Sequence, residues 1–135
     1  RNDRDCHALK QDLESMAAKA GLCTRSHVST TAWQLVNRIV VEELEAWYFG
    51  DWQAVCSAFP RVSPTVPRQA AYRDPDAIHG STWRAFERIL KRSNYFKTGL
   101  RKVEAARVIG THLEPARSSS HSFQKFCQAI AEATA

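Results

Sequence analysis

The spacing of apolar residues predicts a helix near the start of the chain. Leu9, Leu13 and Met16 recur at intervals of four and three residues, which is typical of one face of a helix over residues 6–21. Gly21 is a natural place for this helix to stop, because glycine readily adopts the backbone conformation that ends a helix.

Extended structure is predicted next, in two short segments. Residues 22–28 have the length and composition of a short strand, and a loop separates them from residues 33–41. The second segment carries apolar and β-branched side chains on both faces, as in a strand that is covered on both sides.

The pattern then returns to helical spacing. Residues 42–50 and 51–59 predict two short helices, the first ending at Gly50 and the second capped by Asp51. Residues 60–80 hold four of the five prolines and predict a long irregular connection.

Helical periodicity continues to the end of the chain. Segments 81–92, 97–113 and 122–133 each place apolar residues along one side of a helix. The residues expected to be buried on these helices are Trp83, Phe86, Leu90, Leu100, Val103, Ala106, Phe123, Phe126, Cys127 and Ile130.

These patterns predict the α/β class, with a partial sheet and flanking helices in the front half and a helical C-terminal half. The predicted division is residues 1–59 for the α/β part, 60–80 for the connection and 81–135 for a helical subdomain packed on the α/β part. Two strands alone are marginally stable, so we expect further strands before Arg1, where the sequence starts without a methionine.

The composition is that of a globular domain. The chain has 135 residues, of which 44% are hydrophobic and 24% charged, so one domain with a buried core is expected. No run approaches the ~20 apolar residues of a membrane span, and no membrane partner is expected. The four cysteines form no C-x-x-C pair, which favours reduced thiols, a cytoplasmic location and no structural zinc.

Charge is divided unevenly along the sequence, whose net charge is +5. Residues 1–67 carry seven Lys or Arg and eight Asp or Glu, whereas residues 68–135 carry twelve and six. A basic second half suits a polyanion such as nucleic acid, although a solvated surface would have the same composition. The predicted phosphate-binding residues are Arg84, Arg88, Arg92, Arg117 and Ser120.

Two acidic groups follow the predicted strand ends. Asp3 and Asp5 form a D-x-D, and at the end of a strand both side chains would point to one side. Glu43 and Glu45 follow the second predicted strand, and adjacent strand ends would bring all four carboxylates together as ligands of Mg²⁺ or Mn²⁺. In the alternative interpretation, the aspartates cap the next helix and the glutamates stabilise a first helical turn.

A divalent cation bound by these carboxylates would support phosphoryl or phosphodiester chemistry. Lys97 and Arg101 would then act as catalytic residues that neutralise charge developing on the phosphate. Arg117 and the following serines form a possible phosphate site, but Ser120 or Ser122 could instead cap the last helix.

Several segments that carry these residues resemble one protein family. The segments VNRIVVEELEAWYFGDW, YRDPDAI, YFKTGLRKVEAARVI and ARSSSHSF, with NDRDC and the helix after it, resemble the bacterial Toprim-like domain-of-unknown-function family 4276. The likeness covers nearly the whole chain. It implies a Toprim-like core with Asp3 and Asp5 as its D-x-D, while Glu43 and Glu45 match the E-x-E-A-W segment. The glutamate that such cores carry after a first strand has no counterpart here.

The sequence therefore predicts a Mg²⁺-dependent nuclease or a related phosphoryl-transfer protein. The resemblance adds a partner ATPase and a role in defence against foreign DNA. The alternative is a non-catalytic module whose basic helical half docks on nucleic acid or on an ATPase, and whose acidic residues are structural.

Overall fold

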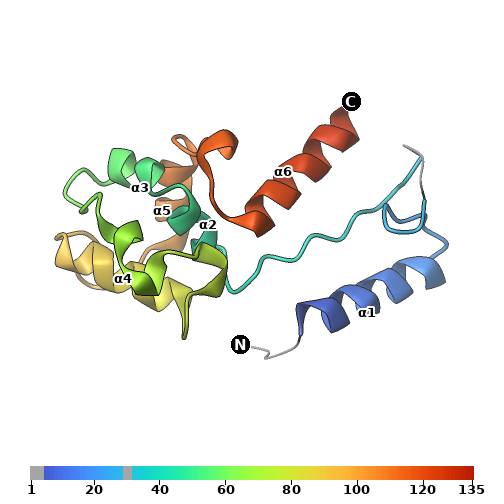
Figure 1. The fold of residues 1–135 in the computed structure, drawn as a ribbon, viewed down its shortest axis with the longest axis horizontal. Coiled ribbons are helices and arrows are strands. Elements are labelled where there is room, and N and C mark those ends of the chain that lie inside the picture. Colours follow the sequence, from blue (N-terminus) through green and yellow to red (C-terminus); the bar gives the residue numbers. More distant parts are fainter. Residues whose placement is uncertain (1–4, 29–31) are drawn as a thin grey trace. The chain divides into compact units, whose positions relative to one another are not determined.

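The computed structural model describes residues 5–28 and 32–135, and its regular structure is helical (Figure 1). The α-helices are α1 (Cys6–Lys19), α2 (Glu45–Gly50), α3 (Trp52–Ala58), α4 (Thr82–Arg92), α5 (Lys102–Gly110) and α6 (His121–Thr134). The 3-10 helices are η1 (Val66–Arg68), η2 (Ala70–Tyr72), η3 (Pro75–Ala77) and η4 (Pro115–Arg117). The chain divides into a first unit, residues 1–39 with 125–135, and a second unit, residues 40–124.

The predicted partial Toprim-like sheet, and with it the α/β class, is wrong. Across residues 5–28 and 32–135 the structure contains no named strand, and the β-pairing found there is an isolated parallel bridge between Thr24 and Leu35. Residues 36–40 run as an extended trace in Figure 1, but no backbone hydrogen bond joins them to another segment of the described chain. β-branched side chains suit a sheet, yet a strand forms only where a second strand supplies its backbone partners.

Helix α1 confirms the first predicted helix and shows why it starts and stops where it does. The Asp5 carboxylate accepts a hydrogen bond from the His7 backbone N–H (3.0 Å), so Asp5 caps the helix. At the other end Gly21 has a φ of +72°, and the Leu22 N–H reaches back to the Ala17 carbonyl (3.0 Å). This glycine-ended motif satisfies carbonyls that the helix itself leaves without partners.

Glu14 is a buried acid of the first unit and faces inward from α1. Its carboxylate accepts hydrogen bonds from the Thr24 hydroxyl and from Asn37 Nδ2 (2.9 Å), and it lies 3.3 Å from His27 Nδ1. Burial raises the pKa of Glu14, but these hydrogen bonds and the His27 charge outweigh burial, so the pKa lies below its ordinary value of 4.5. Glu14 therefore ties the loop after α1 to the helix as a carboxylate.

We expect the stabilisation by Glu14 to depend on pH. Because its pKa is lowered by folding, its contribution is present above pH 4.5 and is lost as the pH falls through the folded-state pKa. In thermal melts followed by circular dichroism, Glu14→Gln should melt below the wild type at neutral pH, and the difference should shrink below pH 4.5. A difference that stays constant as the pH falls would contradict this role.

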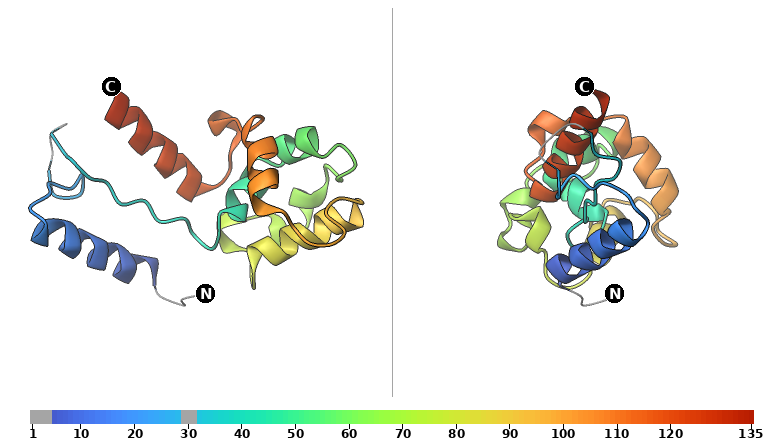
Figure 2. Two further views of the ribbon diagram at one scale, coloured as in Figure 1. Left: turned by 180° about the vertical axis from the view of Figure 1, so that it is seen from behind. Right: turned by 90° about the vertical axis from the view of Figure 1, so that its right-hand side faces the viewer.

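The core of the second unit is built from aromatic side chains. Helix α2 packs against α3, α4 and η3, and α3 packs against α5, so these helices stay gathered in both views of Figure 2. Phe86 is fully buried, with its ring 5.3 Å from Tyr48 and 6.3 Å from Trp52, while Phe49 and Trp52 stack at 5.1 Å. Aromatic pairs at these distances add to the stability that burial provides.

The helices predicted in the back half are present, but part of their predicted burial is wrong. Phe86, Leu90 and Phe123 are buried as expected, whereas Val103 is 67% exposed and Ile130 is 48% exposed. The buried apolar residues of these helices that were not predicted are Ala85, Ile89, Ala105, Ile109 and Ala129. On α5 the first turn is exposed, so the inward face is set by Ala105 and Ile109 one turn apart.

No helix in residues 5–28 and 32–135 combines the length and the apolar composition that crossing a bilayer requires. The four cysteine thiols are free. The division of the chain at residues 59 and 80 stays a prediction.

Candidate functional site

Glu43, a predicted metal ligand, lies at the start of α4. Its Oε2 accepts the backbone N–H of Trp83 (2.7 Å), and the Ser81 hydroxyl lies 3.3 Å from both carboxylate oxygens. Ser81 precedes the helix but makes no capping bond through its own side chain, so the carboxylate of Glu43 takes that place. A carboxylate at a helix N-terminus also interacts favourably with the helix dipole.

Glu45, the second predicted metal ligand of this segment, is buried in the first turn of α2. Its side chain is 5% exposed, and its Oε1 lies 3.2 Å from Lys102 Nζ. Desolvation, with a smaller effect of the Glu45 charge, raises the pKa of Tyr48 to about 12. Glu45 thus links α2 to α5 as a paired charge.

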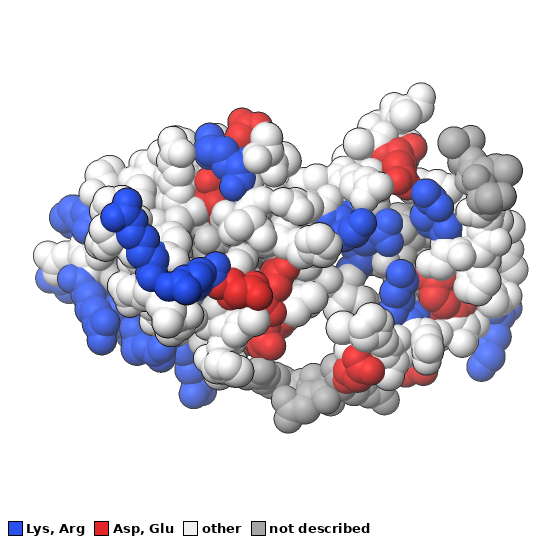
Figure 3. Space-filling model, viewed as in Figure 1, with Lys and Arg blue, Asp and Glu red and all other residues white. Residues whose placement is uncertain are grey.

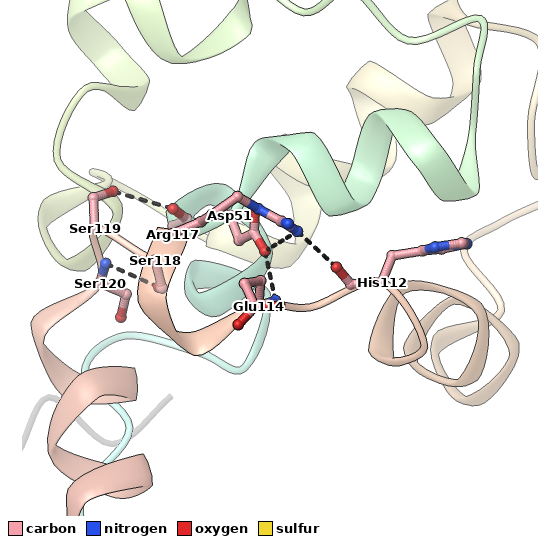
Figure 4. Close-up of polar contacts among 8 residues, drawn as sticks. Asp51, His112, Glu114, Arg117, Ser118, Ser119 and Ser120 are labelled. Atoms are coloured by element: carbon pink, nitrogen blue, oxygen red, sulfur yellow. Dashed lines mark hydrogen bonds and ion pairs between the residues drawn. The ribbon is translucent and has the colours of Figure 1, made fainter.

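Asp51 was predicted to cap the helix after it, but it makes no side-chain capping bond there. Its side chain is 1% exposed and binds Arg117 twice, with Nε 3.1 Å from Oδ1 and Nη2 2.9 Å from Oδ2. The backbone N–H of Glu114 donates to Oδ2 (2.8 Å), and Arg117 Nη2 also donates to the His112 carbonyl (2.8 Å), as Figure 4 shows. The Asp51 hydrogen bond raises the pKa of Arg117. The predicted phosphate ligand Arg117 is therefore engaged within the protein.

Ser120, also predicted to contact phosphate, is fully buried at the start of α6. Its Oγ accepts the Phe123 N–H (3.2 Å), which makes Ser120 the cap of α6, as the alternative interpretation predicted. The same hydroxyl donates to Asp76 Oδ1 (2.8 Å), and the Ser122 N–H donates to Asp76 Oδ2 (2.9 Å). Sequence reasoning missed Asp76, although the Asp-Pro-Asp turn that holds it was noted as part of a family segment.

The loop between η4 and α6 lies directly against α2. The Ser119 N–H donates to the Gly50 carbonyl (3.0 Å), and the Ser119 hydroxyl lies 3.3 Å from the same oxygen, the contact that Figure 4 draws from Ser119. A Cβ atom on Gly50 would lie 2.8 Å from Ser118 Oγ and 2.8 Å from Ser120 Cβ. Glycine is needed at position 50 because the loop leaves no room for a side chain.

The two predicted catalytic residues, Lys97 and Arg101, precede α5 in the chain. Arg101 forms an ion pair with Glu104 (Nε to Oε2, 2.8 Å), and its guanidinium lies 5.2 Å from the centre of the Phe96 ring. Lys97 is exposed, and among the described residues it forms no ion pair. Their catalytic role stays a prediction.

Asp5 is exposed at the start of α1, where ligand atoms of Asp5, Cys6 and His7 lie within 4.8 Å of one another. Asp3 lies outside the described residues. Asp5 belongs to the first unit, whereas Glu43 and Glu45 belong to the second. The expected convergence of these carboxylates stays a prediction.

Three arginines of α4 were predicted to bind phosphate. Arg84, Arg88 and Arg92 are spaced four residues apart, so they share one line along the helix. All three are exposed, and within the described chain none of them forms an ion pair with a carboxylate. In Figure 3, Lys and Arg side chains gather along the edge of the molecule that α4 occupies in Figure 1. This line of arginines is called the α4 arginine row below.

The second unit is thus a helical module in which the candidate acids bind protein groups and the α4 arginine row faces solvent. The chain belongs to the family described as a domain of unknown function (DUF4276), whose sequence model matches residues 2–131. The predicted membership in this family is confirmed. No curated protein and no solved structure matches the chain.

Proposed function

We propose that the second unit binds nucleic acid through the phosphate backbone, with Arg84, Arg88 and Arg92 as the contacts. The observation that carries this proposal is the α4 arginine row, which spans about 12 Å of helix. A guanidinium group that is not paired with a carboxylate can donate two parallel hydrogen bonds to the oxygens of one phosphate. Backbone contacts of this kind do not read the sequence of the bases, so we expect sequence-tolerant binding.

The environment of the acidic residues supports the non-catalytic alternative for this unit. Glu43 caps α4, Glu45 binds Lys102, and Asp51 binds Arg117. Each carboxylate is therefore engaged in a contact that joins two parts of the unit. These contacts give the acids a structural role, and the basic row is left as the feature available to a partner.

Salt-dependent binding tests the proposal. On labelled duplex DNA, followed by fluorescence anisotropy, the logarithm of affinity should fall with the logarithm of salt concentration with a slope of about −3, the value expected for three phosphate contacts. The double reversal Arg88→Glu/Arg92→Glu should make the slope shallower by about 2, since each lost phosphate contact contributes about 0.9.

A second double reversal provides the matched control. Arg68→Glu/Arg73→Glu changes the net charge equally but alters exposed arginines of η1 and the η2–η3 connection. It should leave the slope nearly unchanged if the α4 arginine row makes the contacts. Equal effects of the two reversals, or no binding by the wild type at low salt, would rule out this function.

Metal-dependent phosphodiester cleavage is a second proposal, and the carboxylate, thiol and imidazole grouped at Asp5, Cys6 and His7 favour a cation at that end of the chain. A carboxylate suits Mg²⁺ or Mn²⁺, whereas thiol and imidazole suit softer metals. Asp5→Asn keeps a helix cap but removes the charge, so loss of Mg²⁺- or Mn²⁺-dependent DNA cleavage in this variant would separate metal binding from capping. A partner ATPase and a role in defence against foreign DNA are further proposals, and they rest on the family resemblance alone.

A further inference from the structure

Trp83 differs from the other tryptophans of the second unit in the surroundings of its indole ring. Trp47 Nε1 donates to Ser122 Oγ (2.9 Å), and Trp52 Nε1 donates to the Ser63 carbonyl (2.9 Å). Trp83 is half-buried, and among the described residues its indole N–H has no hydrogen-bond acceptor. The edge of this ring is therefore open to solvent, while the other two rings are fixed within the fold.

Two cations lie against the Trp83 ring. Lys102 Nζ is 4.9 Å from the ring centre, and the guanidinium carbon of Arg84 is 5.5 Å from it. The electron-rich face of an indole attracts such cations. Arg84 is exposed and forms no ion pair with a carboxylate in the described chain, so a phosphate can draw it away from the ring, whereas Lys102 is also paired with Glu45 (3.2 Å).

The backbone of Trp83 is held in place independently of these cations. Its N–H donates to Glu43 Oε2 at 2.7 Å, a charge-assisted bond at the first turn of α4. The ring thus projects from a fixed point beside Arg84, the first member of the α4 arginine row. An aromatic ring next to a line of cations is the combination that binds single strands, because bases stack on the ring while the cations follow the backbone.

We propose that Trp83 is a stacking platform for an unpaired base, which makes single-stranded nucleic acid the preferred ligand of the second unit. This preference rests on the proposed phosphate contacts of the α4 arginine row. In a duplex each base is covered by its neighbours in the stack, so the ring finds no free face. An unpaired base offers that face, and it takes the position of the Arg84 guanidinium when Arg84 turns to a phosphate.

The test compares a labelled oligothymidylate strand with a duplex of the same length by fluorescence anisotropy. The wild type should bind the single strand more tightly. Trp83→Leu should weaken single-strand binding by about 5- to 150-fold and leave duplex binding unchanged. Trp83→Phe keeps an aromatic ring and should restore part of the loss, and thermal melts of each variant confirm that it is folded.

The outcomes separate stacking from phosphate binding. Equal losses on single strand and duplex, or no loss with Trp83→Leu while Arg88→Glu/Arg92→Glu still weakens binding, would overturn the stacking role and leave the α4 arginine row intact. If the wild type binds neither ligand at low salt, the proposed function and the stacking role are both wrong.

Discussion

Replacing Phe86 with alanine should lower the free energy of unfolding by about 3–5 kcal/mol, the usual cost of removing a buried aromatic side chain. Phe86 is 0% exposed and contacts the rings of Tyr48, Phe49 and Trp52, so its removal leaves a cavity among aromatic side chains that cannot easily collapse. Urea denaturation followed by circular dichroism measures this loss.

The matched control for Phe86→Ala is Val103→Ala. Val103 belongs to the set of residues predicted to be buried, but it is 67% exposed, so its truncation should change stability by no more than about 0.5 kcal/mol. A loss of less than about 1 kcal/mol for Phe86→Ala would mean that Phe86 is not in the core.

Replacing Gly50 with alanine should cost about 2–3 kcal/mol, towards the upper end of the range for overpacking. The added methyl group would lie 2.8 Å from Ser118 Oγ and 3.0 Å from the backbone nitrogen of Ser120. The loop that would have to move is held by hydrogen bonds from Ser120 to Asp76 and from Ser119 to the Gly50 carbonyl, so the clash cannot be relieved by one side chain.

Gly110→Ala is the control for Gly50→Ala. Gly110 also ends a helix, but no atom outside its own helix lies within 4 Å of where its Cβ would be. Alanine there should be neutral or stabilising by up to about 1 kcal/mol, since it favours the helix. Equal effects at the two glycines, measured in the same denaturant melts, would mean that the loop does not press on α2.

Helices were the most predictable part of this fold, because their signals are local. In α1, Asp5 caps the start of the helix, Leu9 and Leu13 mark one of its faces, and Gly21 ends it, and all of these signals lie within one segment of sequence. Residues 33–41 also have strand composition, but a strand depends on a second segment elsewhere in space. No pattern within the segment itself could show that this partner is missing from the described chain.

The roles of the acidic residues were harder to predict for a related reason. A carboxylate before a helix has the same sequence signature whether it binds a metal, caps a helix or pairs with a cation. Glu43 turned out to cap a helix 40 residues further on, and Asp51 to bind an arginine 66 residues away. Those partners depend on tertiary packing, whereas the α4 arginine row was predictable because its spacing follows from one helix.

The division of the chain has a consequence for the order in which its parts fold. The first unit takes residues from both sides of the second, and Arg25 pairs with Glu132 (Nε to Oε2, 2.8 Å) across 107 positions of sequence. The second unit is one continuous segment, so its contacts close shorter loops and it can fold before the first unit. Residues 5–28 must wait for the last part of α6, and closing so long a loop makes the first unit the slower of the two to assemble.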